Sequence, residues 1–444
     1  MSQEKLTLES LATSITELTN TLTQGLKDAN FPQPSFAADA PAQLPPNPAI
    51  QGPRLQLVEA LMNMLHLAMG PSEYFLQLGL GLPNEAMVLD MLNHFDIWSK
   101  VPLDGSASYA EIANATKIPE SLIRRFLSVA MRMHLFREEK PGSDRIVHTA
   151  ASAYPVREPV MQSFIAHCME DTRPVSVKGV QALEKFFVGS SEASEELSHS
   201  PFEIAYPGRS VWDLLSQDEP PGKPKGYRAT RFAEAMQAIA KSSSVGTEVA
   251  VNAFDWDKLG ESTVVDVGGS SGHVSVILAK THPKLKFIVQ DLPNAEKSFN
   301  ELISTTNLAS RISFRAHDFF KPQTESADAY LIKSVFHDWP DKYVVQILQN
   351  ITPVLKPGSH VLVFDLVVPP DYDENGKPTV PLSIRRFLGL VDMQMFVAFN
   401  SRERKVEDWV AVFKRADVRL NLDGVYITPG APLAVLDFVF GAAR

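Results

Sequence analysis

The feature that most constrains the fold is a series of short apolar segments that alternates with helical stretches after Glu261. Five such segments, rich in Val, Ile, Leu and Phe, occupy residues 263–267, 287–290, 312–314, 329–333 and 361–364. Apolar strands separated by helices are typical of a parallel sheet that is buried on both faces. The sequence therefore predicts an open α/β sheet of the Rossmann-like type over residues 251–444. Residues 418–428 and 433–440 have no helix between them and are expected to pair antiparallel.

The N-terminal part has a different organisation. Apolar residues Leu11, Ile15, Leu18 and Leu22 follow a 4-3-4 spacing, which places them on one stripe of a helix over residues 6–27. That stripe could pack on its own chain or on a partner subunit. Residues 31–53 are dense in proline, so they are expected to form an extended tether that completes an N-terminal segment, 1–53.

Residues 54–155 are mostly helical in pattern and include a small winged-helix-like unit. Residues 109–116 and 120–133 are expected to form two helices, and the polar stretch 138–145 between short apolar segments is expected to be a hairpin. Winged helices often bind DNA. The chain has 42 basic and 52 acidic side chains, a net charge of −10, which weighs against nucleic acid as a partner. A helical connecting region, 156–250, leads into the α/β part.

Composition excludes several other classes of protein. Cys168 is the only cysteine, so an intrachain disulfide and a cysteine-built metal site are ruled out. No uninterrupted apolar run approaches the ~20 residues that span a bilayer, and the first residues lack a secretory signal. We therefore expect a soluble, cytoplasmic protein with no membrane partner.

The strongest local signal is the segment Val265-Asp266-Val267-Gly268-Gly269-Ser270-Ser271-Gly272-His273. It follows one predicted strand and opens a helix, where glycines let the backbone turn sharply and approach a ligand. It matches neither the dinucleotide fingerprint nor a P-loop, so a plain strand-to-helix turn is the alternative. The next strand ends in Asp291, which could accept bonds from ribose hydroxyls or cap a helix. The third leads to Asp318-Phe319, suited to the amino group and face of adenine. Together these residues favour a ligand that contains adenosine.

The fourth strand runs into Lys333-Ser334-Val335-Phe336-His337-Asp338-Trp339-Pro340-Asp341. His337 thus follows the carboxyl end of a central strand, the edge at which open α/β sheets bind ligands. An imidazole titrates near neutral pH and can accept a proton from a substrate. A lone histidine is more often structural, but its place beside the adenosine site favours catalysis.

These motifs, with the strand ending in Asp365 and the segment from Asp392-Met393 to Glu407-Asp408-Trp409, resemble a known family. The chain resembles S-adenosylmethionine-dependent O-methyltransferases of the plant caffeate/flavonoid type, in the branch common in fungal secondary metabolism, over roughly residues 50–444. The resemblance implies a seven-stranded Rossmann-like methyltransferase sheet, an N-terminal helical winged-helix dimerisation domain and a homodimer. It implies S-adenosylmethionine as cofactor, a small aromatic substrate and no metal.

The resemblance also implies roles for individual residues. His337 would be the general base, flanked by Asp365 and Glu403; plant members usually have Glu at the first of these acids, and Glu403 could instead be a salt-bridged surface acid. The residues implied to bind the cofactor are Asp266, Gly268, Gly269, Gly272, Asp291, Leu292, Asp318, Phe319 and Lys333. Candidates for the substrate pocket are Phe164, His167 and Met395, with Met161, Met169, Met393 and Phe396 beside them; the alternative for each is helix core.

Three functions remain open on the sequence alone. The first is methyl transfer to a hydroxyl, phenolic in type, of a small aromatic metabolite. The second is a lyase or pericyclic reaction on the same fold with the cofactor retained and no methyl transfer. The third is a DNA-binding regulator that uses the winged helix.

Overall fold

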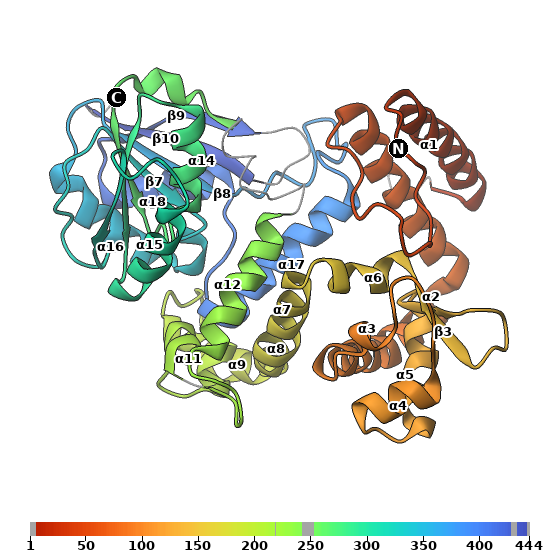
Figure 1. Cartoon of the computed structure of the whole chain (residues 1–444). Coiled ribbons are helices and arrows are strands. Elements are labelled where there is room, and N and C mark those ends of the chain that lie inside the picture. Colours follow the sequence, from red (N-terminus) through yellow and green to blue (C-terminus); the bar gives the residue numbers. More distant parts are fainter. Residues whose placement is uncertain (1–5, 218, 242–252, 428–432, 442–444) are drawn as a thin grey trace. The chain divides into compact units, whose positions relative to one another are not determined.

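A computed structural model describes residues 6–217, 219–241, 253–427 and 433–441 (Figure 1). The chain divides into two compact units. The first comprises residues 1–174, 212–239 and 381–383, and the second comprises residues 175–211, 240–380 and 384–444. Among the described residues, no helix combines the length and hydropathy that a membrane crossing requires.

The second unit is built on a seven-stranded sheet with the strand order β6-β5-β4-β7-β8-β10-β9. Its strands are β4 (Thr263–Val267), β5 (Lys286–Asp291), β6 (Ile312–Ala316), β7 (Ala329–Lys333), β8 (His360–Leu366), β9 (Leu420–Ile427) and β10 (Leu433–Phe440). The five strands from β4 to β8 pair in parallel, whereas β10 pairs antiparallel with both β8 and β9. The predicted α/β sheet and its antiparallel end are confirmed.

Helices cover both faces of this sheet, so the strands are buried on both faces (Figure 1). In β4, Val264 and Val265 point to opposite faces and are both fully buried, each in a different apolar cluster. Burial on both faces explains why the strands have apolar residues at successive positions. The described helical segments of this unit are α9 (Gly179–Phe186), η3 (Leu197–His199), α10 (Pro201–Ala205), η4 (Trp256–Leu259), α14 (His273–Thr281), η5 (Pro293–Ala295), α15 (Glu296–Ser304), η6 (Phe336–Asp338), α16 (Asp341–Ile351), η7 (Thr352–Val354), α17 (Leu382–Phe399) and α18 (Val406–Ala416).

The first unit begins with α1 (Leu8–Asp28), which packs on α2 (Pro48–His94). Thr7 caps α1, and its side chain accepts a hydrogen bond from the amide of Ser10. Leu22 and Leu26 of α1 form a small buried cluster with Ile50 of α2. At its C-terminal end the apolar stripe of α1 therefore packs on its own chain, one of the two alternatives.

The prediction of an extended tether over residues 31–53 is wrong for its last six residues. α2 begins at Pro48, and Pro53 lies inside it. Proline is well tolerated at the first helical position because that residue's N–H would have no intrahelical acceptor, and Asn47 caps the start through its side chain. Gly70, with φ of 71°, and Pro71 interrupt the helix farther along and mark a kink.

The predicted winged-helix-like unit is present. α4 (Tyr109–Thr116) and α5 (Glu120–Arg132) precede a hairpin of β2 (Phe136–Glu138) and β3 (Arg145–His148), to which β1 (Ala107–Ser108) adds a third strand. The remaining helical segments of the first unit are α3 (Ile97–Lys100), α6 (Ala150–Arg157), α7 (Val160–Ala166), the π-helical η2 (His167–Thr172), α11 (Val211–Gln217) and α12 (Tyr227–Ala240). Unit boundaries fall within α8 (Arg173–Ser176), after the first residue of α11, before the last residue of α12 and after the second residue of α17.

Candidate active site

Three sequence-predicted residues meet at the carboxyl edge of the parallel strands. His337 lies in η6 just after β7, Asp365 lies near the end of β8, and Glu403 lies in the segment that precedes α18. Neighbouring parallel strands end at the same edge of a sheet, so β7 and β8 deliver the first two residues side by side. The third comes from a segment whose Arg404 pairs as an isolated bridge with Val367, just beyond β8.

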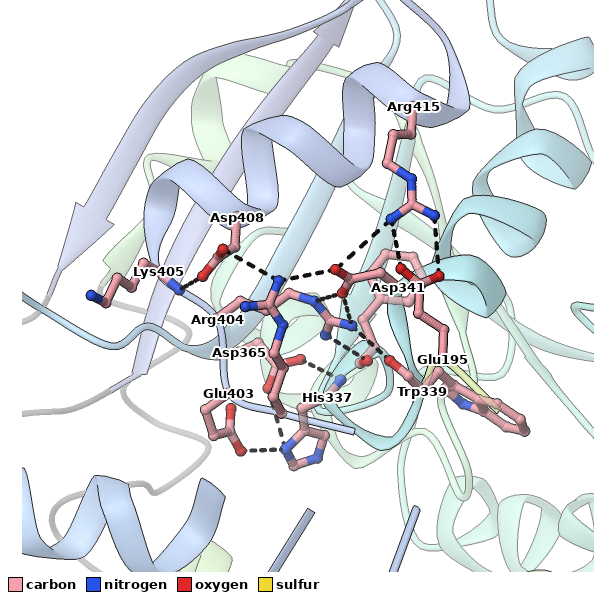
Figure 2. A network of polar contacts seen from close by, with 12 residues as sticks. Glu195, His337, Trp339, Asp341, Asp365, Glu403, Arg404, Lys405, Asp408 and Arg415 are labelled. Atoms are coloured by element: carbon pink, nitrogen blue, oxygen red, sulfur yellow. Dashed lines mark hydrogen bonds and ion pairs between the residues drawn. The ribbon is translucent and has the colours of Figure 1, made fainter. Parts of the chain in front are cut away.

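His337 is held at the imidazole by Glu403 and at the main chain by Asp365 (Figure 2). Its Nδ1 lies 2.9 Å from Oε1 of Glu403, and its main-chain N–H donates to Oδ2 of Asp365 over 3.3 Å. Nδ1 is also 3.7 Å from Oδ1 of Asp365. Since Glu403 occupies Nδ1, the Nε2 atom is the ring nitrogen left for a substrate proton.

The two predicted acids therefore act differently on the imidazole. Asp365 carries the shorter side chain and touches the ring of His337 only at 3.7 Å, while its hydrogen bond goes to the backbone of that residue. The Glu403 side chain is fully buried, so the alternative of a surface acid is excluded. Its backbone N–H donates to Oδ1 of Asp392 over 2.8 Å. Its Oε2 has no hydrogen-bond partner within the described ranges.

A further acid, Asp338, faces the other ring nitrogen. Oδ1 of Asp338 lies 3.6 Å from Nε2 of His337. Burial favours a neutral imidazole, but the negative charges of Asp365, Asp338 and Glu403 outweigh it and raise the pKa of His337 to about 10. Burial, partly opposed by His337, raises the pKa of Asp338 to about 7, and burial also raises that of Glu403. Protons in this cluster are therefore shared among several groups.

The glycine-rich loop lies at the same edge, after β4. The amides of Gly268 and Gly269 both donate to the carbonyl of Gln290 in β5, over 2.8 and 3.1 Å. The amide of Ser270 donates to Oδ2 of Asp291 over 2.8 Å, so the loop and the predicted ribose acid are in direct contact. Burial raises the pKa of Asp291.

Three glycines of the loop are required by space, by backbone geometry or by both. Gly268 has φ of 71°, and a Cβ there would lie 2.8 Å from Cγ2 of Val335. A Cβ on Gly269 would lie 2.6 Å from the carboxyl carbon of Asp266. Gly272 caps α14 with φ of 81° and accommodates the close approach of Val289 and Phe299. The loop thus leaves main chain, rather than side chains, next to any ligand at this edge.

Asp266, which is buried, and Lys333, which is half-buried, lie near the ends of the neighbouring strands β4 and β7. Ser275 donates to Oδ2 of Asp266 over 2.6 Å, yet burial raises the pKa of Asp266 to about 6. Burial lowers the pKa of Lys333, while Asp365 and Asp266 oppose that shift. Lys333 therefore interacts electrostatically with one acid of the glycine-loop region and one acid beside His337.

The predicted adenine-binding pair follows β6. Oδ1 of Asp318 accepts a bond from the amide of Phe320, and the Phe319 ring packs edge-on against Trp339, with ring centroids 5.8 Å apart. A Cβ on Gly268 would lie 3.8 Å from the Phe319 ring, which places this ring beside the glycine-rich loop. Leu292 is 49% exposed and presents an apolar side chain next to Asp291.

The predicted substrate residues are divided between the units. Phe164 in α7 and His167 in η2 belong to the first unit, and both are half-buried. Met395 in α17 belongs to the second unit and is 8% exposed. Their contribution to a substrate pocket stays a prediction.

Several residues of the site were not assigned a role from the sequence. Asp338 and Asp341 lie within the motif that carries His337, Arg404 follows Glu403, and Asp392 begins another recognised motif. Their motif positions were the available signal. Asp338 faces the adjacent His337, whereas Asp341 and Arg404 pair across 63 residues. The ligand atoms of His337, Asp365 and Glu403 lie within 4.8 Å of one another, a spacing that could also hold a cation, so the absence of a metal stays a prediction.

The fold defines the general class: a Rossmann-like enzyme with a glycine-rich loop and a histidine–carboxylate cluster at one edge of the sheet. Residues 193–419 match the family model for the O-methyltransferase domain. The chain is 33% identical to O-methyltransferase pgmB of Aspergillus terreus over 98% of this chain and 96% of that protein. It is 32% identical to O-methyltransferase lcsG of Purpureocillium lilacinum over 91% and 88% of the two chains.

The chain therefore belongs to the S-adenosylmethionine-dependent O-methyltransferase family. Among solved structures, OxaC is similar in fold, with a TM-score of 0.74 and 18% identity over 97% of this chain and 100% of that one. LepI in complex with S-adenosylmethionine has a TM-score of 0.71 and 18% identity over 97% and 99% of the chains.

Proposed function

We propose that this protein transfers the methyl group of S-adenosylmethionine to a phenolic hydroxyl of a small aromatic secondary metabolite, with His337 as general base. The observation that carries the proposal is the 2.9 Å contact between Nδ1 of His337 and the buried Glu403. It orients the imidazole with Nε2 left to accept a proton, beside the glycine-rich loop.

The charges around His337 suit the removal of a phenolic proton. A phenol has a pKa of ~10, so releasing its proton to water at pH 7 costs about 4 kcal/mol. The pKa of His337 is about 10, so transfer from a phenol to neutral His337 is close to balanced. Glu403 and Asp365 stabilise the imidazolium that results, as a carboxylate does behind a catalytic histidine. Because a base must be neutral to accept the proton, activity should rise with pH through the alkaline range.

The loop and the strand ends fit the cofactor. Gly268 and Gly269 bring the backbone close, Asp291 and Asp318 offer carboxylates for hydroxyl and amino groups, and Phe319 offers an aromatic surface. When bound, S-adenosylmethionine supplies a methyl group activated by its sulfonium charge. The chain holds the phenolic oxygen in line with that methyl and takes its proton at Nε2 of His337, so the new O–CH₃ bond leaves a neutral ether.

The test is incubation with methyl-labelled S-adenosylmethionine and a panel of phenols and aromatic polyketides. The expected result is a product heavier by one methyl group together with one equivalent of S-adenosylhomocysteine. A substrate that is converted while the cofactor is recovered unchanged would contradict the proposal.

One observation favours a second candidate, a lyase or pericyclic reaction without methyl transfer. The raised pKa of His337 means that the ligand-free site holds an imidazolium at neutral pH, and this cation could donate a proton or polarise a carbonyl. Recovery of unchanged cofactor in the same assay would support it. Methyl transfer is preferred because the sequence relatives are O-methyltransferases.

We also propose a homodimer that forms through the first unit. Large exposed apolar side chains lie along α2, namely Leu61, Leu65, Leu67, Phe75, Leu76, Leu80, Leu82 and Met87. Large exposed apolar patches mark interaction sites in soluble proteins. A second copy of this helix would cover such a surface. Light scattering after gel filtration should give the mass of a dimer, and the mass of a monomer at micromolar concentration would contradict it.

A further inference from the structure

We propose that Arg404 is a positioning residue for the reaction, because it ties together the three chain segments that carry His337, Asp365 and Glu403. The inference rests on the proposed role of His337 as the base. Arg404 itself contacts none of the reacting atoms in this account and acts only through those residues.

The side chain of Arg404 holds the segment around His337 from both sides (Figure 2). Its Nη1 donates to the carbonyl of Phe336 over 3.0 Å, and its Nη2 donates to the carbonyl of Trp339 over 2.7 Å. These two carbonyls flank the dipeptide His337-Asp338. The guanidinium is fully buried, so water does not compete for these bonds.

The main chain of Arg404 fixes the other two acids. Glu403 precedes it directly, so any shift of Arg404 moves the carboxylate at Nδ1 of the imidazole. The carbonyl of Arg404 accepts a bond from the amide of Val368 over 3.0 Å, and Arg404 pairs with Val367 as an isolated bridge. Val367 is two residues beyond Asp365, so the same residue anchors the end of β8.

Asp341 balances the buried positive charge. Its Oδ1 lies 2.8 Å from Nε and 2.7 Å from Nη2 of Arg404, and its Oδ2 lies 3.0 Å from Arg402. Burial alone would raise the pKa of Asp341, but the guanidinium groups of Arg404 and Arg402 outweigh it and lower that pKa. The arginine plane also lies over the ring of Trp409, with 4.9 Å from Cζ to the centroid. The guanidinium is thus fixed in one orientation.

Geometry, rather than charge alone, is what a planar guanidinium supplies at this place. Lysine is a point charge on a flexible stem and cannot bond two carbonyls and a carboxylate in one fixed plane. A displacement of about 1 Å in a catalytic group can cost roughly 100-fold in rate. Both Arg404→Lys and Arg404→Met should therefore impair the chemical step.

The experiment compares Arg404→Lys and Arg404→Met with the wild type and with Arg415→Met as the matched control. Arg415 also approaches Asp341, at 4.0 Å, but it is 47% exposed and pairs mainly with Glu195. We expect kcat to fall by about 10–100-fold in both Arg404 variants. The KM for S-adenosylmethionine and its calorimetric Kd should stay within about threefold, and the control should match the wild type.

A structural role alone would not produce the coupling expected with Glu403. If Arg404 acts through the pair of Glu403 and His337, Arg404→Met should cost much less in a Glu403→Gln background than in the wild type. Equal costs in both backgrounds, or wild-type kcat in both Arg404 variants, would overturn the proposal. If neither Arg404 variant binds S-adenosylhomocysteine, Asp341→Asn is measured instead. A fall in kcat in this variant would support the proposal, and an unchanged kcat would overturn it. Full activity of His337→Ala would instead refute the proposed function, which keeps the two failures distinct.

Discussion

Each unit of the protein contains a histidine beside buried carboxylates, but the two clusters have opposite charge balances. In the second unit, His337 faces three acids, Asp338, Asp365 and Glu403. In the first unit, Nδ1 of His167 lies 3.1 Å from Asp171. In that cluster arginines bind the acid beside the histidine, whereas no arginine among the described residues binds the acids at the His337 ring.

The cluster in the first unit is held by arginines of α12. Arg228 and Arg231 both bind Asp171, with 2.5 Å from Nη2 of Arg231 to Oδ1, and Arg231 also binds Glu170. Burial would raise the pKa of Asp171, but the hydrogen bond from His167 and the charges of the two arginines outweigh it and lower that pKa. This network joins η2 to α12, and Asp171 stays ionised at neutral pH.

The difference shows how charge balance separates a structural cluster from one suited to proton transfer. Guanidinium groups do not lose their protons at physiological pH, so they hold the acids paired with them in the ionised form. Arg404 approaches the His337 cluster as well, but its donors go to two carbonyls and to Asp341. The acids around His337 therefore depend on the imidazole for their counter-charge, and burial raises the pKa values of Asp338 and Glu403.

The largest effect is expected for His337→Ala. Methyl transfer should fall by about 10²–10⁴-fold, because the phenolic proton loses its acceptor. The Kd of S-adenosylmethionine, measured by calorimetry, should stay close to wild type. The matched control is His360→Gln in β8, since His360 also pairs with a carboxylate, Asp437, but at the opposite end of the strand. Loss of cofactor affinity in His337→Ala would contradict the assignment.

The next effect is on stability and concerns the cluster in the first unit. Arg231→Met removes the buried arginine that pairs with both Glu170 and Asp171 and leaves Arg228 as the arginine at Asp171. Breaking a buried pair typically costs about 3–5 kcal/mol. Urea unfolding should show a clearly lower midpoint. Arg124→Met removes an exposed arginine of α5 that also pairs with two acids, and it should shift the midpoint far less. Similar shifts in the two variants would show that the buried network is not the structural element described.

A smaller effect is expected for Glu403→Gln. The amide can still accept a bond from His337, but it no longer stabilises the imidazolium, so kcat should fall by about 10–100-fold at the optimal pH. The missing charge also lowers the pKa of His337, which should move the rising limb of the pH–rate profile to lower pH. A rising limb that moves to higher pH, or that stays at the same pH, would indicate that Glu403 does not set the pKa of His337.

Most of the fold could be predicted from the sequence because it depends on local patterns. The apolar runs located all seven strands of the large sheet, and the spacing around Pro119 located both winged-helix helices. The start of α2 was missed because a proline-rich segment can also begin a helix when asparagine caps it. The local sequence pattern does not show which prolines lie before a helix and which lie inside it.

The site was only partly predictable. His337 and the glycine-rich loop stand out because each follows a strand, but the partnership of His337 with Glu403 came from family resemblance. The role of Arg404 was missed because it depends on how residues 336–341 and 403–404, far apart in sequence, fold against each other. The role of Asp338 was missed because it depends on the direction in which its side chain turns toward the neighbouring imidazole. The direct hydrogen bond of the ring to Glu403 rather than to Asp365 likewise depends on side-chain length and position.

The most direct test of the charge-balance account is the pKa of His337 itself. It can be measured by NMR on protein labelled with ¹⁵N in the histidine rings, with His337→Gln identifying the signal. We expect His337 to titrate near pH 10 in the wild type and at a clearly lower pH in Glu403→Gln. A wild-type pKa near the ordinary value of ~6.5, unchanged by loss of the Glu403 charge, would contradict that account.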